Sequence, residues 1–79
     1  MKREDLPAAL YVVMQKMGGA GTLLDICKEF WKQFETDLRQ SGDLFYTWQY
    51  DIRWAATTLR KLGKMEDTSN CAKGIWKII

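Results

Sequence analysis

The segment that decides the fold is Asp51–Asp67, which reads DIRWAATTLRKLGKMED. In this segment and just before it, apolar residues recur at helical spacing: Trp48, Ile52, Ala55, Ala56, Leu59 and Leu62. The pattern predicts an amphipathic helix over about residues 48–62, capped by Thr47 and with Asp51 near its positive end. Gly63 follows the last apolar position, where a glycine in the left-handed conformation commonly ends a helix. The two small alanines in mid-stripe indicate close approach to a neighbouring helix.

The other side of this predicted helix is basic. It carries Arg53, Arg60 and Lys61, and Lys64 follows the glycine stop. Two interpretations fit these residues. They form either the solvated side of an ordinary core helix or a face that contacts something negatively charged.

The N-terminal part of the chain predicts a helix over about residues 6–17. Asp5 precedes Pro7, and a capping residue with a proline in the first turn suits a helix start. The apolar stripe of this helix is Leu10, Val13, Met14 and Met17. The glycine-rich stretch Gly18–Gly21 is expected to end the helix and turn the chain.

A further helix is predicted over about residues 23–39. It begins at Thr22–Asp25, a variant of the capping box with Asp in place of Glu or Gln. One face carries Cys27, Phe30, Trp31, Phe34 and Leu38 at helical spacing. The short stretch DLFY, residues 43–46, fits either an extended segment or a loop.

Downstream of the glycine stop, the chain predicts a β-hairpin over about residues 64–79. Turn-forming residues occupy 67–74, and Gly74–Ile79 alternates as a strand does, with Trp76 and Ile78 on one face. Three helices followed by a hairpin describe a winged helix-turn-helix, mainly α with a small β-hairpin. We therefore expect residues 1–79 to form one three-helix winged helix-turn-helix domain.

The composition argues against an enzyme and against a metal or cofactor site. The chain has 79 residues, no histidine and two cysteines, Cys27 and Cys71, far apart in the sequence. Structural zinc needs four ligands at recognisable spacing, and acid–base catalysis most often uses histidine. The stretch MGGAGT lacks the Gly-Lys-Ser/Thr ending of a phosphate-binding loop. We expect no catalytic residue, no metal and no cofactor, with free thiols and Cys27 as a small core residue.

The same composition predicts a cytoplasmic protein that does not enter the membrane. No apolar run is long enough to span a bilayer. The N-terminus lacks the apolar stretch and small-residue cleavage site of a secretory signal.

Positive charge is concentrated in the second half of the chain. Residues 1–46 hold six Lys and Arg against seven Asp and Glu, a net charge of −1. Residues 47–79 hold six against three, a net charge of +3. The excess therefore falls on the predicted third helix and hairpin, where a winged helix would meet a duplex, and phosphate neutralisation by Lys and Arg drives such binding.

The tryptophans are expected in the core rather than on a stacking surface. Trp31, Trp48 and Trp76 lie on apolar stripes. Trp54 lies off its stripe, so we expect it to pack under the hairpin or under the loop before the third helix. If it were exposed beside Phe45 or Tyr46, it would instead indicate a protein-binding patch.

The stretch IRWAATTLRKLGKME, followed by KGIWKI, resembles the winged-helix domain at the N-terminus of Mrr-type restriction endonucleases. The positions that carry the resemblance are Arg53, Trp54, Ala55, Lys61, Gly63, Gly74 and Trp76. The early LPAAL and the glycine-rich turn are also similar to the family's opening. This chain departs from the family at Lys64, where an apolar residue is usual, and by having Cys71 in the hairpin. The resemblance implies a DNA-binding module that is normally joined to a nuclease domain.

In a winged helix bound to DNA, the third helix lies in the major groove and the wing contacts the backbone or the minor groove. Base contacts are then expected from Gln49, Arg53, Thr57, Arg60 and Lys61, and phosphate contacts from Lys64, Lys73 and Lys77. Each position also has a purely structural interpretation. A lysine at a helix C-terminus is favoured by the helix dipole, and Arg53 could pair with Asp51, Gln49 or an aromatic ring.

The rival function is a winged-helix module for protein–protein interaction. Such a module could form dimers, or it could be a phage or mobile-element protein that acts on host machinery. It would expose an aromatic or Met-rich patch and bind with little dependence on salt, whereas a DNA-binding module would present one basic face over helix and wing.

Overall fold

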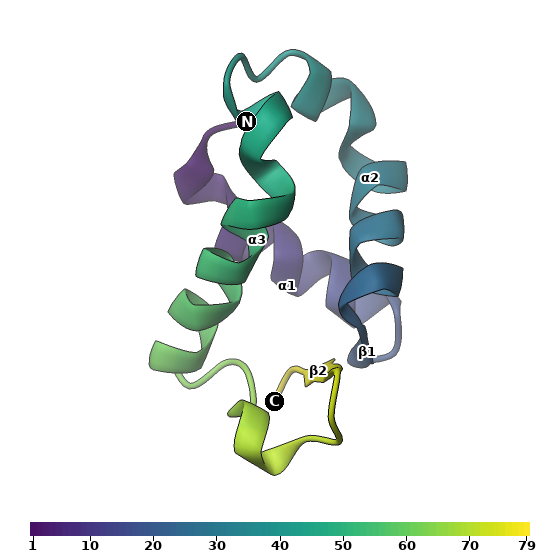
Figure 1. The fold of residues 1–79 in the computed structure, drawn as a ribbon, viewed down its shortest axis with the longest axis vertical. Coiled ribbons are helices and arrows are strands. Elements are labelled where there is room, and N and C mark those ends of the chain that lie inside the picture. Colours follow the sequence, from purple (N-terminus) through teal and green to yellow (C-terminus); the bar gives the residue numbers. More distant parts are fainter.

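The computed structural model describes residues 1–79 and contains three α-helices and a small antiparallel sheet (Figure 1). The helices are α1 (Leu6–Lys16), α2 (Leu23–Arg39) and α3 (Leu44–Lys61), and the strands are β1 (Ala20–Thr22) and β2 (Ile75–Lys77). Two single 3-10 turns, η1 (Arg3–Asp5) and η2 (Thr68–Asn70), complete the elements. In Figure 1, α2 and α3 lie on either side of α1, and the C-terminal segment closes the lower end. The predicted fold, a three-helix winged helix-turn-helix with a small β part, is confirmed.

The three helices meet in one core of fifteen buried apolar side chains. The predicted stripes supply most of it: Leu10, Val13 and Met14 from α1, Phe30 and Leu38 from α2, and Trp48, Ile52 and Leu59 from α3. Ala55 and Ala56 are both completely buried. Their small side chains let α3 pack closely against α1, as the sequence pattern predicted. None of the helices combines the length and apolar composition that a membrane span requires.

Glycines end α1 and α3 through the same hydrogen-bonded turn. At the end of α3, Gly63 has φ +74°, its N–H donates to the Arg60 carbonyl, and the Lys64 N–H donates to the Leu59 carbonyl. Gly18 has φ +87° and makes the corresponding turn after α1. This pair of bonds is the Schellman motif, which needs a residue with positive φ. The predicted stop at Gly63 is confirmed.

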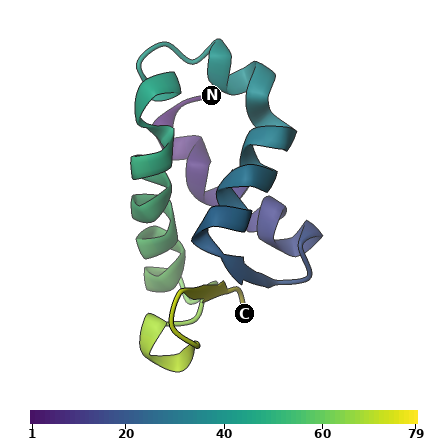
Figure 2. The ribbon, with the colours of Figure 1, turned by 45° about the vertical axis from the view of Figure 1, so that its right-hand side comes forward.

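The C-terminal segment forms a wing whose returning strand also pairs with the segment between α1 and α2. The Met65–Ile78 bridge and the Glu66 N–H to Lys77 carbonyl bond (2.8 Å) close the predicted hairpin. On its other edge, β2 runs antiparallel to β1, with Gly21 opposite Trp76 (Figure 2). The stretch 18–21, predicted as a turn only, therefore contains a strand.

The third helix begins at Leu44, four residues before the predicted start at 48. Gly42, with φ +61°, turns the chain tightly after α2, and the buried Leu44 side chain anchors the first helical turn. Leu44, Phe45 and Tyr46 are therefore helical, with Asp43 as the N-cap, and DLFY is neither extended nor a loop as predicted. Thr47 consequently lies inside the helix and does not cap it. The prediction of a core position at 62 is also wrong: Leu62 is 63% exposed, because the helix ends at Lys61 and the following turn carries this side chain outward.

The N-terminal residues hold α3 through a small polar cluster. Asp51 is only 9% exposed; it accepts a hydrogen bond from Thr47 Oγ1 (2.8 Å) and pairs with Arg3 Nε (3.5 Å). The guanidinium of Arg3 also lies 4.0 Å from the centre of the Trp54 ring. Trp54 therefore packs under the N-terminal segment, and not under the wing or the loop before α3 as predicted. Because α3 begins at Leu44, Asp51 lies beyond its first turn and does not interact with the helix dipole as predicted. Its buried carboxylate instead joins α3 to Arg3.

Removing the Arg3 side chain should lower the free energy of unfolding by a measurable amount. We expect Arg3→Ala to lower the free energy of unfolding by about 1–2 kcal/mol, because a largely buried carboxylate loses its cation. For a domain of this size each kcal/mol corresponds to roughly 4–8 °C in Tm, which calorimetry resolves. Lys32→Ala, at an exposed position without an ion pair, is the matched control and should change the free energy by less than about 0.5 kcal/mol. Equal Tm values for the two variants would contradict the structural role of Arg3.

Candidate nucleic-acid interface

Four of the five predicted contact residues of α3 lie in one row along its exposed side. Gln49, Arg53, Thr57 and Lys61 are all exposed, and they follow each other at intervals of four residues. Residues four apart on a helix are neighbours on its surface, so the row forms a continuous strip. The Thr57 hydroxyl is partly engaged, since it donates to the Arg53 carbonyl (3.2 Å). Arg53 forms no ion pair within the chain, although the sequence left pairing with Asp51 open.

No carboxylate opposes this row on α3. Asp51 is the only acidic residue between Leu44 and Lys61, and it is buried on the opposite side of the helix, against Arg3. The exposed side of α3 therefore presents two uncompensated cations and two polar side chains that can donate and accept hydrogen bonds.

Arg60, also predicted to contact DNA, is engaged with the wing. Its side chain is half-buried, its Nε donates to the Glu66 carbonyl (3.2 Å), and its guanidinium lies 5.4 Å from the centre of the Trp76 ring. Trp76 in turn packs against the core. Arg60 thus joins α3 to both strands of the wing, while its terminal Nη groups make no hydrogen bond within the chain.

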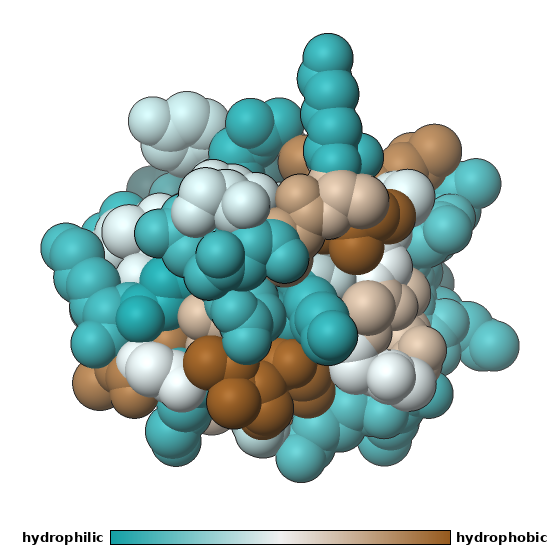
Figure 3. Space-filling model, turned by 90° about the horizontal axis from the view of Figure 1, so that it is seen from below, coloured by the Kyte–Doolittle hydropathy of each residue, from teal (hydrophilic) through white to brown (hydrophobic).

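The remaining predicted residues lie on or next to the wing and are exposed. Lys64 directly follows the glycine stop, with its Nζ 6.0 Å from the centre of the Tyr11 ring. Lys73 precedes β2, and Lys77 lies on β2 opposite Ala20. The end of the molecule that carries the wing is mostly hydrophilic, with separate hydrophobic patches (Figure 3).

Acidic residues of the wing lower its positive charge. Glu66 accepts a hydrogen bond from the Asn70 amide (3.5 Å), and the Asp67 carboxylate caps η2 through the Ser69 N–H (3.3 Å). Their negative charges offset two of the wing's lysines. The uncompensated charge is therefore greatest on α3.

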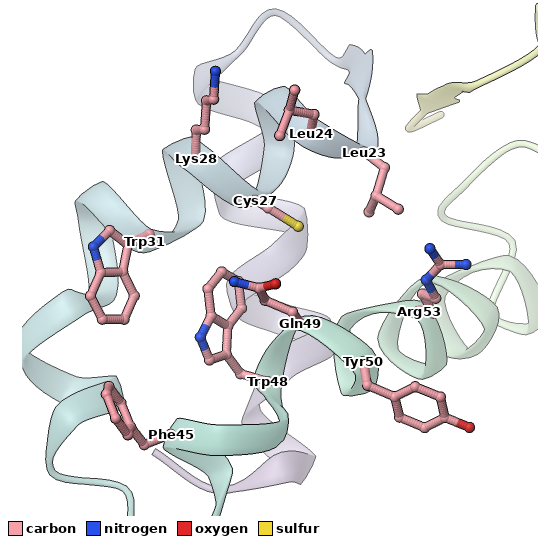
Figure 4. Close-up of a pocket in the computed structure, with 10 residues that line it drawn as sticks. All are labelled: Leu23, Leu24, Cys27, Lys28, Trp31, Phe45, Trp48, Gln49, Tyr50 and Arg53. Carbon is pink, nitrogen blue, oxygen red and sulfur yellow. The ribbon is translucent and has the colours of Figure 1, made fainter.

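An apolar groove, which the sequence did not predict, lies beside the row between α2 and α3 (Figure 4). We call it the α2–α3 groove. Its lining is Leu23, Leu24, Cys27, Lys28 and Trp31 from α2, with Phe45, Trp48, Gln49, Tyr50 and Arg53 from α3. The sequence contained one signal for it: Tyr50, which lines the groove, is an aromatic residue off the apolar stripe of α3. Tyr50 is 77% exposed, and Tyr46, four residues earlier but outside the groove, is 82% exposed.

The thiol of Cys27 points into this groove (Figure 4). Burial raises the pKa of the Cys27 thiol above its ordinary value, and the positive charge of Arg53 offsets part of that effect. Both cysteines are free, as predicted, but Cys27 is only half-buried and lines a groove instead of lying within the core. No three cysteine, aspartate or glutamate side chains come together as metal ligands would.

Comparison with known proteins found no relative of this chain. No protein-family model matches it, and neither a curated protein nor a solved structure is significantly similar to it.

We expect Arg60→Lys to loosen the wing without changing the net charge. Lysine cannot both cover the Trp76 ring and donate in the geometry of the arginine Nε. Amide hydrogen exchange at Glu66 and Ile79, whose N–H groups bridge the wing, should accelerate by about fivefold, the equivalent of ~1 kcal/mol. Lys61→Arg, on the neighbouring exposed residue, should leave these rates unchanged. Unaltered exchange in Arg60→Lys would mean that Arg60 does not hold the wing.

The Cys27 environment predicts slow thiol chemistry. At about pH 8, Cys27 should react with iodoacetamide more slowly than Cys71, because a raised pKa leaves less thiolate. Arg53→Gln should slow Cys27 further, since removing the positive charge raises the thiol pKa again, and should leave Cys71 unaffected. Peptide mass spectrometry separates the two sites. Faster reaction of Cys27 in Arg53→Gln would show that Arg53 does not stabilise the thiolate.

Proposed function

We propose that this chain is a double-stranded-DNA-binding winged-helix module without catalytic activity of its own. The observation that carries the proposal is the row Gln49, Arg53, Thr57 and Lys61, which is exposed on the third helix and faces no carboxylate. In a winged helix this helix is the one that enters the major groove. Neutralisation of phosphates by such cations supplies the sequence-independent part of DNA binding.

Within this proposal the residues divide by the chemistry they can perform. An arginine can bind guanine through two hydrogen bonds and a glutamine can bind adenine in the same way, so Arg53 and Gln49 are the candidates for base contacts. Thr57 and Lys61 are the next candidates along the row, and Arg60 can reach DNA only through its Nη groups. Lys64, Lys73 and Lys77, which are exposed on or next to the wing, are the candidates for phosphate contacts along the backbone.

The biological setting is proposed from the resemblance to Mrr-type endonucleases. It suggests a cytoplasmic protein of a restriction-modification system, in which the nuclease chemistry resides in another domain or another chain. The module itself requires no cofactor for the binding proposed here.

Protein–protein interaction is the second candidate function, and the α2–α3 groove favours it. Exposed aromatic side chains such as Tyr46 and Tyr50 are enriched at protein interfaces. The groove shares Gln49 and Arg53 with the row on α3, so a partner protein and a DNA duplex would compete for these two side chains.

The proposal predicts salt-dependent binding to a random-sequence duplex of about 25 bp. The variant Arg53→Gln/Lys61→Gln should weaken binding by about tenfold or more and reduce the slope of log K against log salt by roughly two, because on a duplex without a specific site each of these cations neutralises about one phosphate instead of contacting a base. Arg60 is left intact, because its replacement would also disturb the wing. Fluorescence anisotropy at two salt concentrations measures both quantities.

The matched control is Lys16→Gln/Lys32→Gln, which removes the same charge from exposed positions on α1 and α2. It should retain most of the affinity. If both double variants lost the same affinity, net charge alone would explain the loss, and the row on α3 would have no special role. If the folded wild type did not bind at low salt, DNA would be ruled out as the ligand.

A further inference from the structure

We propose that the α2–α3 groove binds an acidic amphipathic helix of a partner protein. Seven of its ten lining residues are hydrophobic. Leu24 is 63% exposed and Tyr50 is 77% exposed, so large apolar side chains at its rim remain in contact with water. Covering them would release that water and favour binding.

The charges of the groove determine the chemistry of the partner. Lys28 stands on the α2 side and Arg53 on the α3 side (Figure 4), and neither forms an ion pair within the chain. No acidic residue lines the groove. A partner helix with an apolar stripe flanked by Glu or Asp would bury its stripe in the groove. Its carboxylates would pair with Lys28 on one side and with Arg53 on the other.

The dimensions of the groove fit two to three turns of helix. Its α2 wall runs from Leu23 to Trp31, a length of about 12 Å at 1.5 Å per residue. Apolar anchors at positions i, i+4 and i+7 of a partner helix cover that distance. Gln49 points into the groove and makes no hydrogen bond within the chain, so it can pair with a polar group of the partner (Figure 4).

Other occupants suit the groove less well. A second copy docked groove to groove would bring the Lys28 and Arg53 cations of both copies into one interface to which the groove linings contribute no carboxylate. Duplex DNA offers phosphates to the cations but little apolar surface to the leucines and aromatic rings. For a single-stranded base, the rings of Trp31 and Trp48 already stack on each other, with centroids 6.0 Å apart, which leaves less ring face free.

The test is a selection from displayed helical peptides of about 12 residues, long enough to span the groove, with the full chain as bait. Leu or Phe is fixed at i, i+4 and i+7, and the flanking positions are randomised among Glu, Lys, Gln and Ser. We expect the enriched peptides to carry Glu at the flanks. They should slow alkylation of Cys27 several-fold and leave that of Cys71 unchanged, since the second thiol lies in the wing.

Paired variants locate the peptide. Leu24→Gln/Tyr50→Gln should weaken the binding of an enriched peptide by about tenfold or more. Leu62→Gln is the control, because Leu62 is also 63% exposed but lies outside the groove, and affinity should stay within about twofold. All three substituted residues are exposed, so neither variant disturbs the core.

Four results would overturn the proposal. They are no enrichment, enrichment without acidic flanks, equal protection of both cysteines, and equal affinities in the two variants. Protection of Cys27 by oligothymidine would assign the groove to single-stranded nucleic acid instead. A wild-type dimer that dissociates in Leu24→Gln/Tyr50→Gln would assign it to a second copy. The inference is independent of the proposed DNA binding, because no duplex takes part in the experiment.

Discussion

Where α2 meets α3, the ring of Trp48 stacks on that of Phe30, with centroids 5.4 Å apart and planes 16° from parallel. Phe30 is fully buried and Trp48 nearly so. A chain of this length buries only roughly 60–65% of its unfolded surface. The stability of such a small core therefore depends strongly on each large aromatic contact. It holds α3 against α2 while the small alanines let α3 pack closely on α1. The exposed side of α3 is thereby held toward solvent, with Gln49 and Arg53 at its border with α2.

The same contact connects the core to the α2–α3 groove. Trp48 also stacks with Trp31, and Trp31 lies beside Phe45 at a centroid distance of 6.2 Å. This chain of rings runs from the centre of the domain to the groove wall. Arg53 belongs both to the row on α3 and to the groove, so ligands at the two surfaces would meet at this side chain. If both proposals hold, a partner protein bound in the groove would thus affect DNA binding directly, without a conformational change.

The sequence predicted the features that depend on periodicity and on glycine. The stripes of α1 and α2, the stop at Gly63 and the hairpin were all visible, because burial imposes helical spacing and a left-handed turn requires glycine. The strand Ala20–Thr22 was missed, since three residues are too few to show an alternating pattern and the pairing partner lies more than fifty residues away. The early start of α3 was missed for a similar reason: the burial of Leu44 is a tertiary contact.

The candidate site was predicted in outline but not in detail. Gln49, Arg53, Thr57 and Lys61 are exposed in one row, as helical spacing requires. Spacing could not reveal that Arg60, on the same side, would turn back to the wing and cover Trp76. Nor could it reveal that Arg3, from the other end of the chain, would pair with the buried Asp51. Both contacts join segments whose proximity exists only in the folded chain.

The proposed DNA-binding surface is the exposed side of α3. The most direct measurement is a titration of the isotope-labelled chain with a short duplex at low salt, followed residue by residue by NMR. If the exposed side of α3 contacts DNA, the largest shifts occur at Gln49, Arg53, Thr57 and Lys61, with smaller shifts in the wing and little change in α1. Shifts confined to α1, or no shifts at all, would contradict it.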